Sequence, residues 1–286
     1  MKKDVVLLTG AGEIGIAIAR RIAQGKIILM GNIKEEESEA KAQTLRAAGF
    51  EVVTTYLDLS NRESIQAFVK KGLELGEIAH LINAAGVSPS QVPIKTILKV
   101  DLYGTAVLLE EVGKVIKKGG TGVTISSQSG YRMEQLGAKK DKELAMTPCE
   151  ELLDLDFLQE ENIKNTLHAY QLAKRCNGKR VMYEAVNWGK RGARINSISP
   201  GIVVTPLALD EFNGIRGDFY KNMFAKSPAG RPACPDEIGA LAEFIMGPAG
   251  AFITGSDFLI DGGSTASYFY GSLNPELKSG MAEGDK

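Results

Sequence analysis

The sequence predicts a single-domain α/β protein with a doubly wound, seven-stranded parallel sheet and helices on both faces. Short apolar runs alternate with longer segments of helical periodicity, which is the pattern of repeated strand-helix units. A chain of 286 residues, 44% of them hydrophobic, can also bury a full core. Right-handed crossovers between parallel strands give the doubly wound fold, whose ligands bind outside the carboxyl ends of the strands.

The elements can be placed in order along the chain. The apolar runs that predict the seven strands are Val5–Leu8, Ile27–Met30, Val52–Tyr56, Ala79–Asn83, Gly122–Ser126, Ala193–Ile198 and Asp257–Ile260. The segments that predict helices are Gly15–Gln24, Glu36–Ala48, Arg62–Glu74, Val100–Lys117, Asn165–Trp188 and Pro235–Met246. We expect one domain over residues 1–270, with a polar insertion at residues 131–164 and a flexible tail at residues 271–286.

Composition and charge favour a small-molecule partner. The formal net charge of −1 gives no electrostatic footprint for nucleic acid or an anionic membrane. No run of about 18 apolar residues occurs, so we expect neither a membrane span nor a signal peptide. Cys149, Cys176 and Cys234 have neither zinc-site spacing nor a disulfide framework, so we expect no metal site and a reducing, cytoplasmic location.

A glycine-rich loop follows the first predicted strand directly. The sequence TGAGEIGIA places Gly10, Gly12 and Gly15 in GxGxxG spacing before an amphipathic helix. The first glycine permits a tight turn, the second lets the backbone approach a pyrophosphate, and the third allows close packing of the helix. We therefore expect the loop, including Glu13 and Ile14, to bind a dinucleotide.

The end of the second strand bears on which dinucleotide is bound. Enzymes specific for NAD usually place an acid here that bonds the adenine ribose hydroxyls, but this position holds Asn32. Asn32 does not repel a 2′-phosphate, and Lys34 can reach one or can be an ordinary surface lysine. The carboxylate of Glu13, in the glycine loop, would repel the 2′-phosphate of NADP. The cofactor is expected to be NAD(P), with a slight lean to NADP over NAD.

Tyr170 and Lys174 stand four residues apart in a predicted helix, so their side chains leave it on one face. A tyrosine with a pKa near ~10 is a poor acid or base at neutral pH, and an adjacent cation lowers that pKa by stabilising the phenolate. This spacing also occurs on many solvated helix faces. The pair therefore needs support from other motifs.

Several motifs in the right order supply that support, and together they resemble the short-chain dehydrogenase/reductase family from Val5 to Gly263. In that family, the residue matching Asp58 meets the adenine ring, and Leu59 beside it is also expected to be a cofactor-binding residue. The segments ISSQSG and ITGSDFLIDGG match the catalytic-serine motif, at Ser127, and the last strand. The further residues that match cofactor-binding positions are Asn83, Ala84, Ala85 and Gly86 in NAAG, and Pro200, Gly201, Ile202, Val203 and Thr205 in the nicotinamide-binding turn.

The resemblance implies hydride exchange between a nicotinamide and an alcohol or ketone carbon. Tyr170 is then the acid or base, Lys174 bonds the nicotinamide ribose, and the Ser127 hydroxyl bonds the substrate oxygen. Ser126 and Ser129 are alternatives to Ser127, although the distance to Gly130 favours Ser127. The resemblance also implies a homodimer or homotetramer. An epimerase or dehydratase and a catalytically silent dinucleotide sensor remain alternative functions.

The chain departs from the family in three places. Asp101 stands where the family has an asparagine that holds a water linked to the lysine, and its charge is expected to favour the charged lysine and to oppose the tyrosinate. The glycine loop is one residue shorter than usual. The insertion Tyr131–Lys164 separates Ser127 from Tyr170, as in some bacterial members that act on steroids, and we expect it to be a substrate lid, with packing or assembly as the alternative.

The segment Leu207–Ser227 corresponds to the family's mobile substrate-binding flap. It is rich in apolar residues, and its aromatic and thioether side chains are those of Phe212, Phe219, Tyr220, Met223 and Phe224. These side chains favour a hydrophobic or ring-containing alcohol or ketone, although about half of them are expected to belong to the core.

Overall fold

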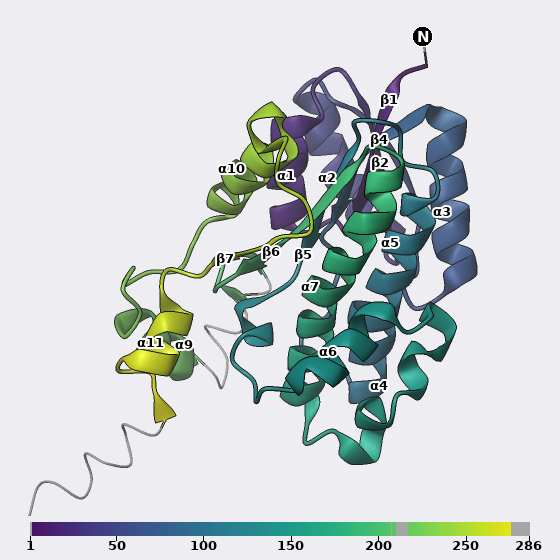
Figure 1. Ribbon diagram of the computed structural model, residues 1–286. Coiled ribbons are helices and arrows are strands. Elements are labelled where there is room, and N and C mark those ends of the chain that lie inside the picture. The colour runs from purple at the N-terminus through teal and green to yellow at the C-terminus, as the bar shows by residue number, and fades with distance from the viewer. Residues whose placement is uncertain (1, 207, 210–216, 276–286) are drawn as a thin grey trace, which may run out of the picture.

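The computed structural model describes residues 2–206, 208–209 and 217–275 (Figure 1). Within these residues seven strands form one parallel sheet in the order β3-β2-β1-β4-β5-β6-β7, which confirms the predicted doubly wound Rossmann architecture. The strands are β1 (Asp4–Thr9), β2 (Ile27–Asn32), β3 (Glu51–Tyr56), β4 (Glu77–Asn83), β5 (Thr121–Ile125), β6 (Arg194–Pro200) and β7 (Asp257–Ile260). The strand order reverses between β1 and β4, so the ligand-binding crevice of this fold is expected at their carboxyl ends.

Helices cover both faces of the sheet (Figure 1). The α-helices are α1 (Glu13–Ile22), α2 (Glu35–Ala47), α3 (Arg62–Leu75), α4 (Ile94–Ile97), α5 (Thr105–Gly113), α6 (Gly137–Met146), α7 (Thr166–Lys190), α9 (Gly217–Ala225), α10 (Pro235–Met246) and α11 (Ser264–Tyr270). The π-helix η1 (Leu98–Gly104) and the 3₁₀ turns η2 (Gln128–Gly130), η3 (Cys149–Asp154), η4 (Asp156–Leu158), η5 (Glu160–Asn162) and η6 (Pro248–Gly250) complete the elements. Among the described residues, no helix has the length and apolarity needed to cross a bilayer.

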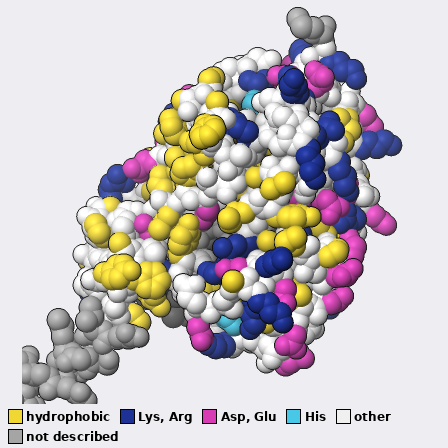
Figure 2. Space-filling view, viewed as in Figure 1, with side chains coloured by type: hydrophobic (Ala, Val, Ile, Leu, Met, Phe, Trp, Pro, Cys, Tyr) yellow, Lys and Arg dark blue, Asp and Glu magenta, His cyan; other side chains and the backbone are white. Residues whose placement is uncertain are grey.

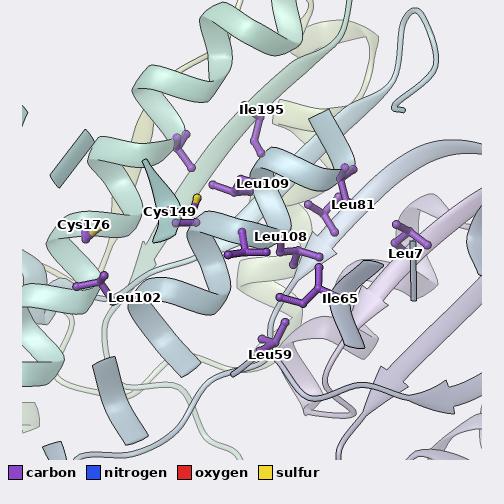
Figure 3. Close-up of a cluster of buried hydrophobic side chains, with 14 of the residues drawn as sticks. Leu7, Leu59, Ile65, Leu81, Leu102, Leu108, Leu109, Cys149, Cys176 and Ile195 are labelled. Atoms are coloured by element: carbon purple, nitrogen blue, oxygen red, sulfur yellow. The ribbon is translucent and has the colours of Figure 1, made fainter. Parts of the chain in front are cut away.

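The core has two halves, one on each face of the sheet, because successive strand side chains point to opposite faces. Val6 and Leu8 of β1 belong to the cluster that includes buried residues of α1, α2 and α10. Val5 and Leu7 belong to the cluster with α3, α5 and α7. Figure 3 shows part of this second cluster, in which Leu7 lies with Leu108 of α5. Strands buried on both faces explain the nearly continuous apolar runs in the sequence.

The predicted single helix Val100–Lys117 is wrong. The chain is helical from Ile94, turns into the π-helix η1, and returns to α-helical geometry in α5, which ends at Gly113. A Cβ on Gly104, at the end of η1, would lie 2.2 Å from the carbonyl oxygen of Leu59, so the backbones approach closely there. The π-helix also carries Asp101, which is 1% exposed. A propensity pattern does not reveal such a local change of helix type.

The insertion at residues 131–164 is packed against the body of the domain. It contains α6 and the turns η3 to η5, and it contacts α7 and η1. Its buried apolar side chains join the same core as α5 and α7, and Figure 3 shows Cys149 among them. These side chains are Leu144, Cys149, Leu152, Leu158 and Ile163. The structure therefore supports the packing alternative for residues 133–164, and the expectation of a lid stays a prediction.

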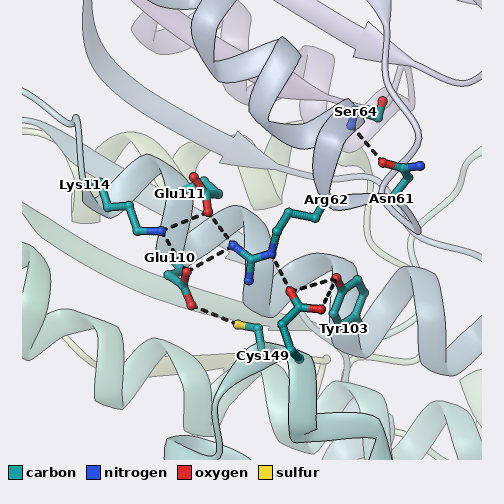
Figure 4. A network of polar contacts seen from close by, with 9 residues as sticks. Asn61, Arg62, Ser64, Tyr103, Glu110, Glu111, Lys114 and Cys149 are labelled. Atoms are coloured by element: carbon teal, nitrogen blue, oxygen red, sulfur yellow. Dashed lines mark hydrogen bonds and ion pairs between the residues drawn. The ribbon is translucent and has the colours of Figure 1, made fainter.

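Polar contacts fix the insertion at two further places. Asp141 of α6 accepts two hydrogen bonds from the guanidinium of Arg175 in α7, at 2.6 and 2.7 Å. Arg62 at the start of α3 pairs with Glu150 of η3 at 2.5 Å and with Glu110 of α5 at 3.1 Å (Figure 4). The Cys149 thiol donates to Glu110 in the same network. The bidentate, partly buried pair of Arg175 and Asp141 holds α6 and α7 in a fixed geometry. A segment that opens and closes as a lid would not need such a contact.

Candidate active site

A cavity of about 940 Å³ lies at the carboxyl ends of β4, β5 and β6. It is bordered by the start of α1, by the N-terminal part of α7 and by residues of α9 and α11. The predicted site residues that line it are Ile14, Ala84, Ala85, Gly86, Ser127, Tyr170, Lys174, Pro200, Gly201, Ile202, Val203 and Thr205. The fold therefore brings most of the predicted nicotinamide and catalytic positions to one cavity.

Tyr170 and Lys174 share one face of α7, as their spacing predicts. The Lys174 Nζ lies 5.2 Å from the centre of the Tyr170 ring, and the lysine is only 6% exposed. Asn165 caps the N-terminus of α7, where its side-chain oxygen accepts from the backbone N–H of His168 at 2.9 Å. The cap fixes where α7 begins, and so fixes the position of the pair one turn later.

Asp101 is the acidic partner of Lys174. Its Oδ2 lies 3.4 Å from Lys174 Nζ, and its Oδ1 accepts from the Val87 N–H at 2.9 Å. Burial opposes the charged lysine, but the nearby carboxylate outweighs burial and raises the pKa of Lys174 above its usual value. The direct contact with Asp101 thus favours the charged form of Lys174, as expected from the sequence. A Cβ on Gly86 would lie 3.2 Å from Asp101 Oδ1, so a glycine suits this wall.

The hydrogen bonds of Ser126 and Ser127 distinguish these two serine alternatives. The hydroxyl of Ser126 is directed into the protein, where it donates to the backbone carbonyl of Lys174 at 2.7 Å. Ser127 lies on the cavity and its Oγ accepts from the Ser129 N–H at 3.1 Å, which leaves the hydroxyl proton available as a donor. Of these two, Ser127 is the serine whose hydroxyl can serve a ligand in the cavity.

The glycine loop fits a dinucleotide although it is one residue short. Gly10 has a positive φ of 79°, and a Cβ there would lie 3.0 Å from the Ala85 backbone. A Cβ on Gly15 would lie 2.8 Å from Leu8. Gly12 caps α1, and a Cβ there would meet nothing within 4 Å. Two glycines therefore serve packing, and the third leaves open space at a helix N-terminus, where a phosphate can lie.

The residues expected to determine the preference for NAD or NADP form hydrogen bonds or ion pairs with neighbouring groups. Lys34 pairs with Glu37 at 2.7 Å on the exposed surface. The Asn32 amide is used locally, since its Oδ1 accepts from the Ile33 N–H at 3.0 Å. Glu13 forms an ion pair with Lys41 of α2, which the sequence analysis missed. Lys41 can be found from sequence only if α2 is known to pack beside the glycine loop.

Three predicted cofactor residues have side chains that serve the fold. Leu59 is 5% exposed and lies in the core. The Asn83 side chain is buried between β1 and α5, where its Oδ1 accepts from the Thr9 hydroxyl at 2.7 Å. Asp58 accepts from the Ser60 N–H at 2.8 Å. None of the three lines this cavity, and their assignment to the cofactor site stays a prediction.

The sequence analysis missed several cavity residues. Arg132 lines the cavity, whereas no residue from 133 to 166 does. Gln128 and Tyr268 line it as well. Of the predicted flap residues, Met223 and Tyr220 contribute to the cavity, Phe212 and Leu207 lie outside the described residues, and the Phe219 side chain is not described. The position of Arg132, two residues after the end of ISSQSG, was the available signal for it.

The fold and the cavity together define a class of protein. A doubly wound parallel sheet, with a glycine loop at its switch point and a Tyr-Lys pair beside Ser127, is typical of dinucleotide-dependent oxidoreductases. A family model described as short chain dehydrogenase matches residues 4–138, and one described as Enoyl-(Acyl carrier protein) reductase matches residues 135–265. The chain belongs to the short-chain dehydrogenase/reductase family, and it is an NAD(P)-dependent enzyme that acts on CH–OH groups.

Individual relatives agree with this assignment. The chain is 35% identical over 267 residues to the short-chain dehydrogenase/reductase bsc3 of Alternaria brassicicola, covering 93% of this chain and 97% of that one. It is 26% identical to the 3-alpha-hydroxysteroid dehydrogenase/carbonyl reductase of Comamonas testosteroni, covering 84% and 96%. A short-chain dehydrogenase from Burkholderia cenocepacia, solved in complex with NADP, has a similar fold, with a TM-score of 0.71 at 22% identity over 92% of this chain and 97% of that one.

Proposed function

We propose that this protein interconverts a hydrophobic or cyclic alcohol and the corresponding ketone, with Tyr170 as the acid or base. The observation that carries the proposal is the position of the Lys174 ammonium, 5.2 Å from the centre of the Tyr170 ring on the wall of the cavity. An ammonium at this position stabilises a phenolate, so Tyr170 can give up or take a proton near neutral pH. Bound NAD(P) supplies or accepts the hydride.

Each residue of the site has a distinct part in the proposed reaction. In reduction, Tyr170 donates its proton to the substrate carbonyl oxygen, and Ser127 donates a hydrogen bond to the same oxygen as negative charge develops there. Lys174 stabilises the phenolate that remains and, with the cofactor bound, is within reach of the nicotinamide ribose. Asp101 holds Lys174 in place. In oxidation the proton moves in the opposite direction.

We propose NADP as the preferred cofactor. The Glu13 carboxylate would repel a 2′-phosphate, but its ion pair with Lys41 removes most of that repulsion. Lys41 therefore offers the positive charge that the sequence analysis assigned to Lys34. Gly10, Gly12 and Gly15 provide the turn for the pyrophosphate, and the backbone from Pro200 to Thr205 provides the wall for the nicotinamide.

The lining of the cavity supports a substrate with an apolar body. The cavity wall includes the apolar side chains of Val87, Leu167, Met223 and Leu273. The substrate class in the name of the Comamonas relative, a steroid alcohol, is consistent with a ring system of this kind. The substrate body is therefore expected to be cyclic and largely apolar.

The test is a panel of cyclic and acyclic ketones offered with NADPH or NADH, followed by the near-ultraviolet absorbance of the reduced nicotinamide. Oxidation of NADPH with formation of the alcohol is the expected result. The matched negative control is the same panel with Lys174→Met, which should keep the fold and lose turnover. Tight NADPH binding without turnover of any ketone by the parent would favour the silent sensor, and conversion without net change in the reduced cofactor would favour an epimerase or dehydratase.

We also propose that the protein forms a homodimer or homotetramer. Exposed apolar side chains gather over α10 and over α11 (Figure 2). Tyr270 at the end of α11 is 88% exposed, and Phe252, just after η6, is 103% exposed. Clusters of this kind often mark association surfaces. Light scattering on the purified protein should give a mass of two or four chains, and a single-chain mass at micromolar concentration would contradict the proposal.

A further inference from the structure

Two nitrogen donors in the wall of the catalytic cavity converge on one weak acceptor. Nη1 of Arg132 lies 3.6 Å from the Met223 sulfur, and Nε2 of Gln128 lies 4.0 Å from the same sulfur. All three residues line the cavity; Gln128 and Met223 are each 7% exposed, and the Arg132 side chain is 11% exposed. A thioether is a poor hydrogen-bond acceptor, so these donors are poorly satisfied by the contacts among the described residues.

The rest of the Arg132 side chain is fixed. Its Nε donates to the Thr265 hydroxyl at 3.2 Å, its Nη2 donates to the Gln128 side-chain oxygen, and its guanidinium lies 5.7 Å from the centre of the Tyr268 ring. The backbone carbonyl of Arg132 accepts from Gln171, the residue after Tyr170, at 2.7 Å. The guanidinium is thus held by Thr265, Gln128 and Tyr268, and the Arg132 backbone is bonded to α7 next to Tyr170.

The nearest carboxylate does not satisfy Arg132. Asp261 lies 3.8 Å from Nη2, which is an ion-pair distance without a hydrogen bond. Its oxygens accept from the backbone N–H groups of Gly263, at 2.9 Å, and Thr265, at 2.6 Å, and so stabilise the start of α11. Burial lowers the pKa of Arg132 although Asp261 opposes this, so the buried charge is only partly compensated.

The charges on the cavity wall point to an anionic ligand. Among the described residues that line it, Arg132 and Lys174 are the cations, and there is no aspartate or glutamate. Lys174 is already paired with Asp101. Arg132 is the charge that remains for the substrate, and its planar fork suits a carboxylate better than any neutral acceptor.

We propose that Arg132 and Gln128 form a subsite for a carboxylate carried by the substrate, remote from its reacting carbon. The carboxylate takes the place of the Met223 sulfur and accepts from Arg132 Nη1 and Gln128 Nε2. Met223 belongs to α9, and an unbranched thioether side chain can move aside with little strain. The preferred substrates are then cyclic oxo acids or hydroxy acids. This inference rests on the proposed function, because it takes the cavity to be the substrate site.

The test measures binding without turnover. Cyclohexanecarboxylate and cyclohexanecarboxamide, which have the same ring and carry no ketone, are titrated by calorimetry into the enzyme saturated with NADPH. The parent should bind the carboxylate roughly tenfold or more tightly than the amide, as expected for hydrogen bonds to a charged group. Equal affinity of the parent for the two ligands would overturn the subsite, and this comparison needs no variant.

Variants then assign the subsite to its residues. In Arg132→Met and in Gln128→Leu the preference for the carboxylate should shrink, to about twofold or less in Arg132→Met. The matched control Arg20→Met removes an exposed arginine of α1 and should leave the preference unchanged. Melting temperature and NADPH affinity report whether each variant is folded, because Arg132 also contacts Thr265. A folded Arg132→Met enzyme that keeps the parent's preference would overturn the assignment.

Failure of this inference can be told apart from failure of the proposed function. If no ketone oxidises NADPH but the carboxylate binds through Arg132, the proposed reaction is wrong and the subsite stands. If 4-oxocyclohexanecarboxylate and its methyl ester are reduced with the same KM, the reaction stands and the carboxylate subsite is wrong.

Discussion

Asp101 Oδ2 lies 3.4 Å from Lys174 Nζ, and both side chains are almost completely buried. The same ammonium lies 5.2 Å from the centre of the Tyr170 ring, so one cation serves two groups that carry or can acquire negative charge. The Asp101 carboxylate keeps the lysine charged, and it also opposes formation of the tyrosinate. Burial raises the pKa of Asp101, and we expect its charged form to raise the pH at which the proposed acid and base chemistry occurs.

Replacing Asp101 by asparagine should shift the pH dependence of alcohol oxidation to lower pH. Asparagine can keep the hydrogen bond from the Val87 N–H, but it removes the negative charge that opposes the tyrosinate. The apparent pKa of the acidic limb of kcat/KM should fall by about one pH unit. Glu110→Gln, which removes a carboxylate outside the cavity, is the control. A pH profile for Asp101→Asn that superimposes on that of the parent would show that Asp101 does not influence the ionisation of Tyr170.

The packed insertion should contribute to global stability. Leu152 of η3 is fully buried, so Leu152→Ala leaves a cavity and should lower the free energy of unfolding by about 2–5 kcal/mol. Leu73→Ala, at a position that is 41% exposed, should cost less than about 0.5 kcal/mol. Denaturant unfolding followed by circular dichroism measures both. A cost for Leu152→Ala as small as that of the control would mean that the insertion opens independently of the domain.

Lys41 should matter more than Lys34 for NADP binding. Lys41→Gln leaves Glu13 unpaired beside the glycine loop, and the affinity for NADPH should fall roughly tenfold while that for NADH changes little. Lys34→Gln breaks only an exposed pair with Glu37 and should have a small effect on both. Fluorescence titration of the two reduced cofactors gives the four affinities. A larger loss of NADPH affinity in Lys34→Gln would reverse the assignment.

His80 should make the protein less stable as the pH falls through mildly acidic values. Burial lowers its pKa from 6.5 to about 4, and its Nδ1 is 2.8 Å from the Thr121 hydroxyl. The unfolded chain therefore binds a proton that the folded chain does not, between pH 6.5 and about 4, and stability rises with pH across that window. The effect is at most about 3 kcal/mol. His80→Gln should flatten this part of the stability profile. His168→Gln is the comparison, at a partly buried histidine whose pKa burial also lowers, and it should act in the same direction.

Much of the fold follows from local patterns in the sequence. Strands such as β1 and β2 are buried on both faces, so continuous apolar runs reveal them, and a glycine with a positive φ, such as Gly10, marks its own turn. The π-helix η1 was missed because its cause is tertiary. Its residues meet the Leu59 backbone and place Asp101 against Lys174, contacts between segments that are distant in sequence.

In the candidate site, too, local sequence patterns reveal some features, and others depend on tertiary contacts. Spacing and motif order pointed to Tyr170, Lys174 and Ser127, and the fold brings all three to one cavity. Side-chain partners were beyond the sequence. Leu59 and Asn83 were assigned to the cofactor site by family match, and the sequence did not show that Leu59 packs in the core or that Asn83 accepts from Thr9. Arg132 and Lys41 gained their importance from neighbours on other elements, which no local pattern shows.

The central claim is that Tyr170 exchanges the proton with the substrate oxygen. Its most direct test compares the parent with Tyr170→Phe in single-turnover reduction of a ketone by bound NADPH, with Tyr183→Phe on the same helix as the control. Tyr170→Phe should bind NADPH with the parent's affinity and reduce the ketone about a thousandfold more slowly, and the control should match the parent. A Tyr170→Phe enzyme that oxidises NADPH at the parent's rate would contradict the account.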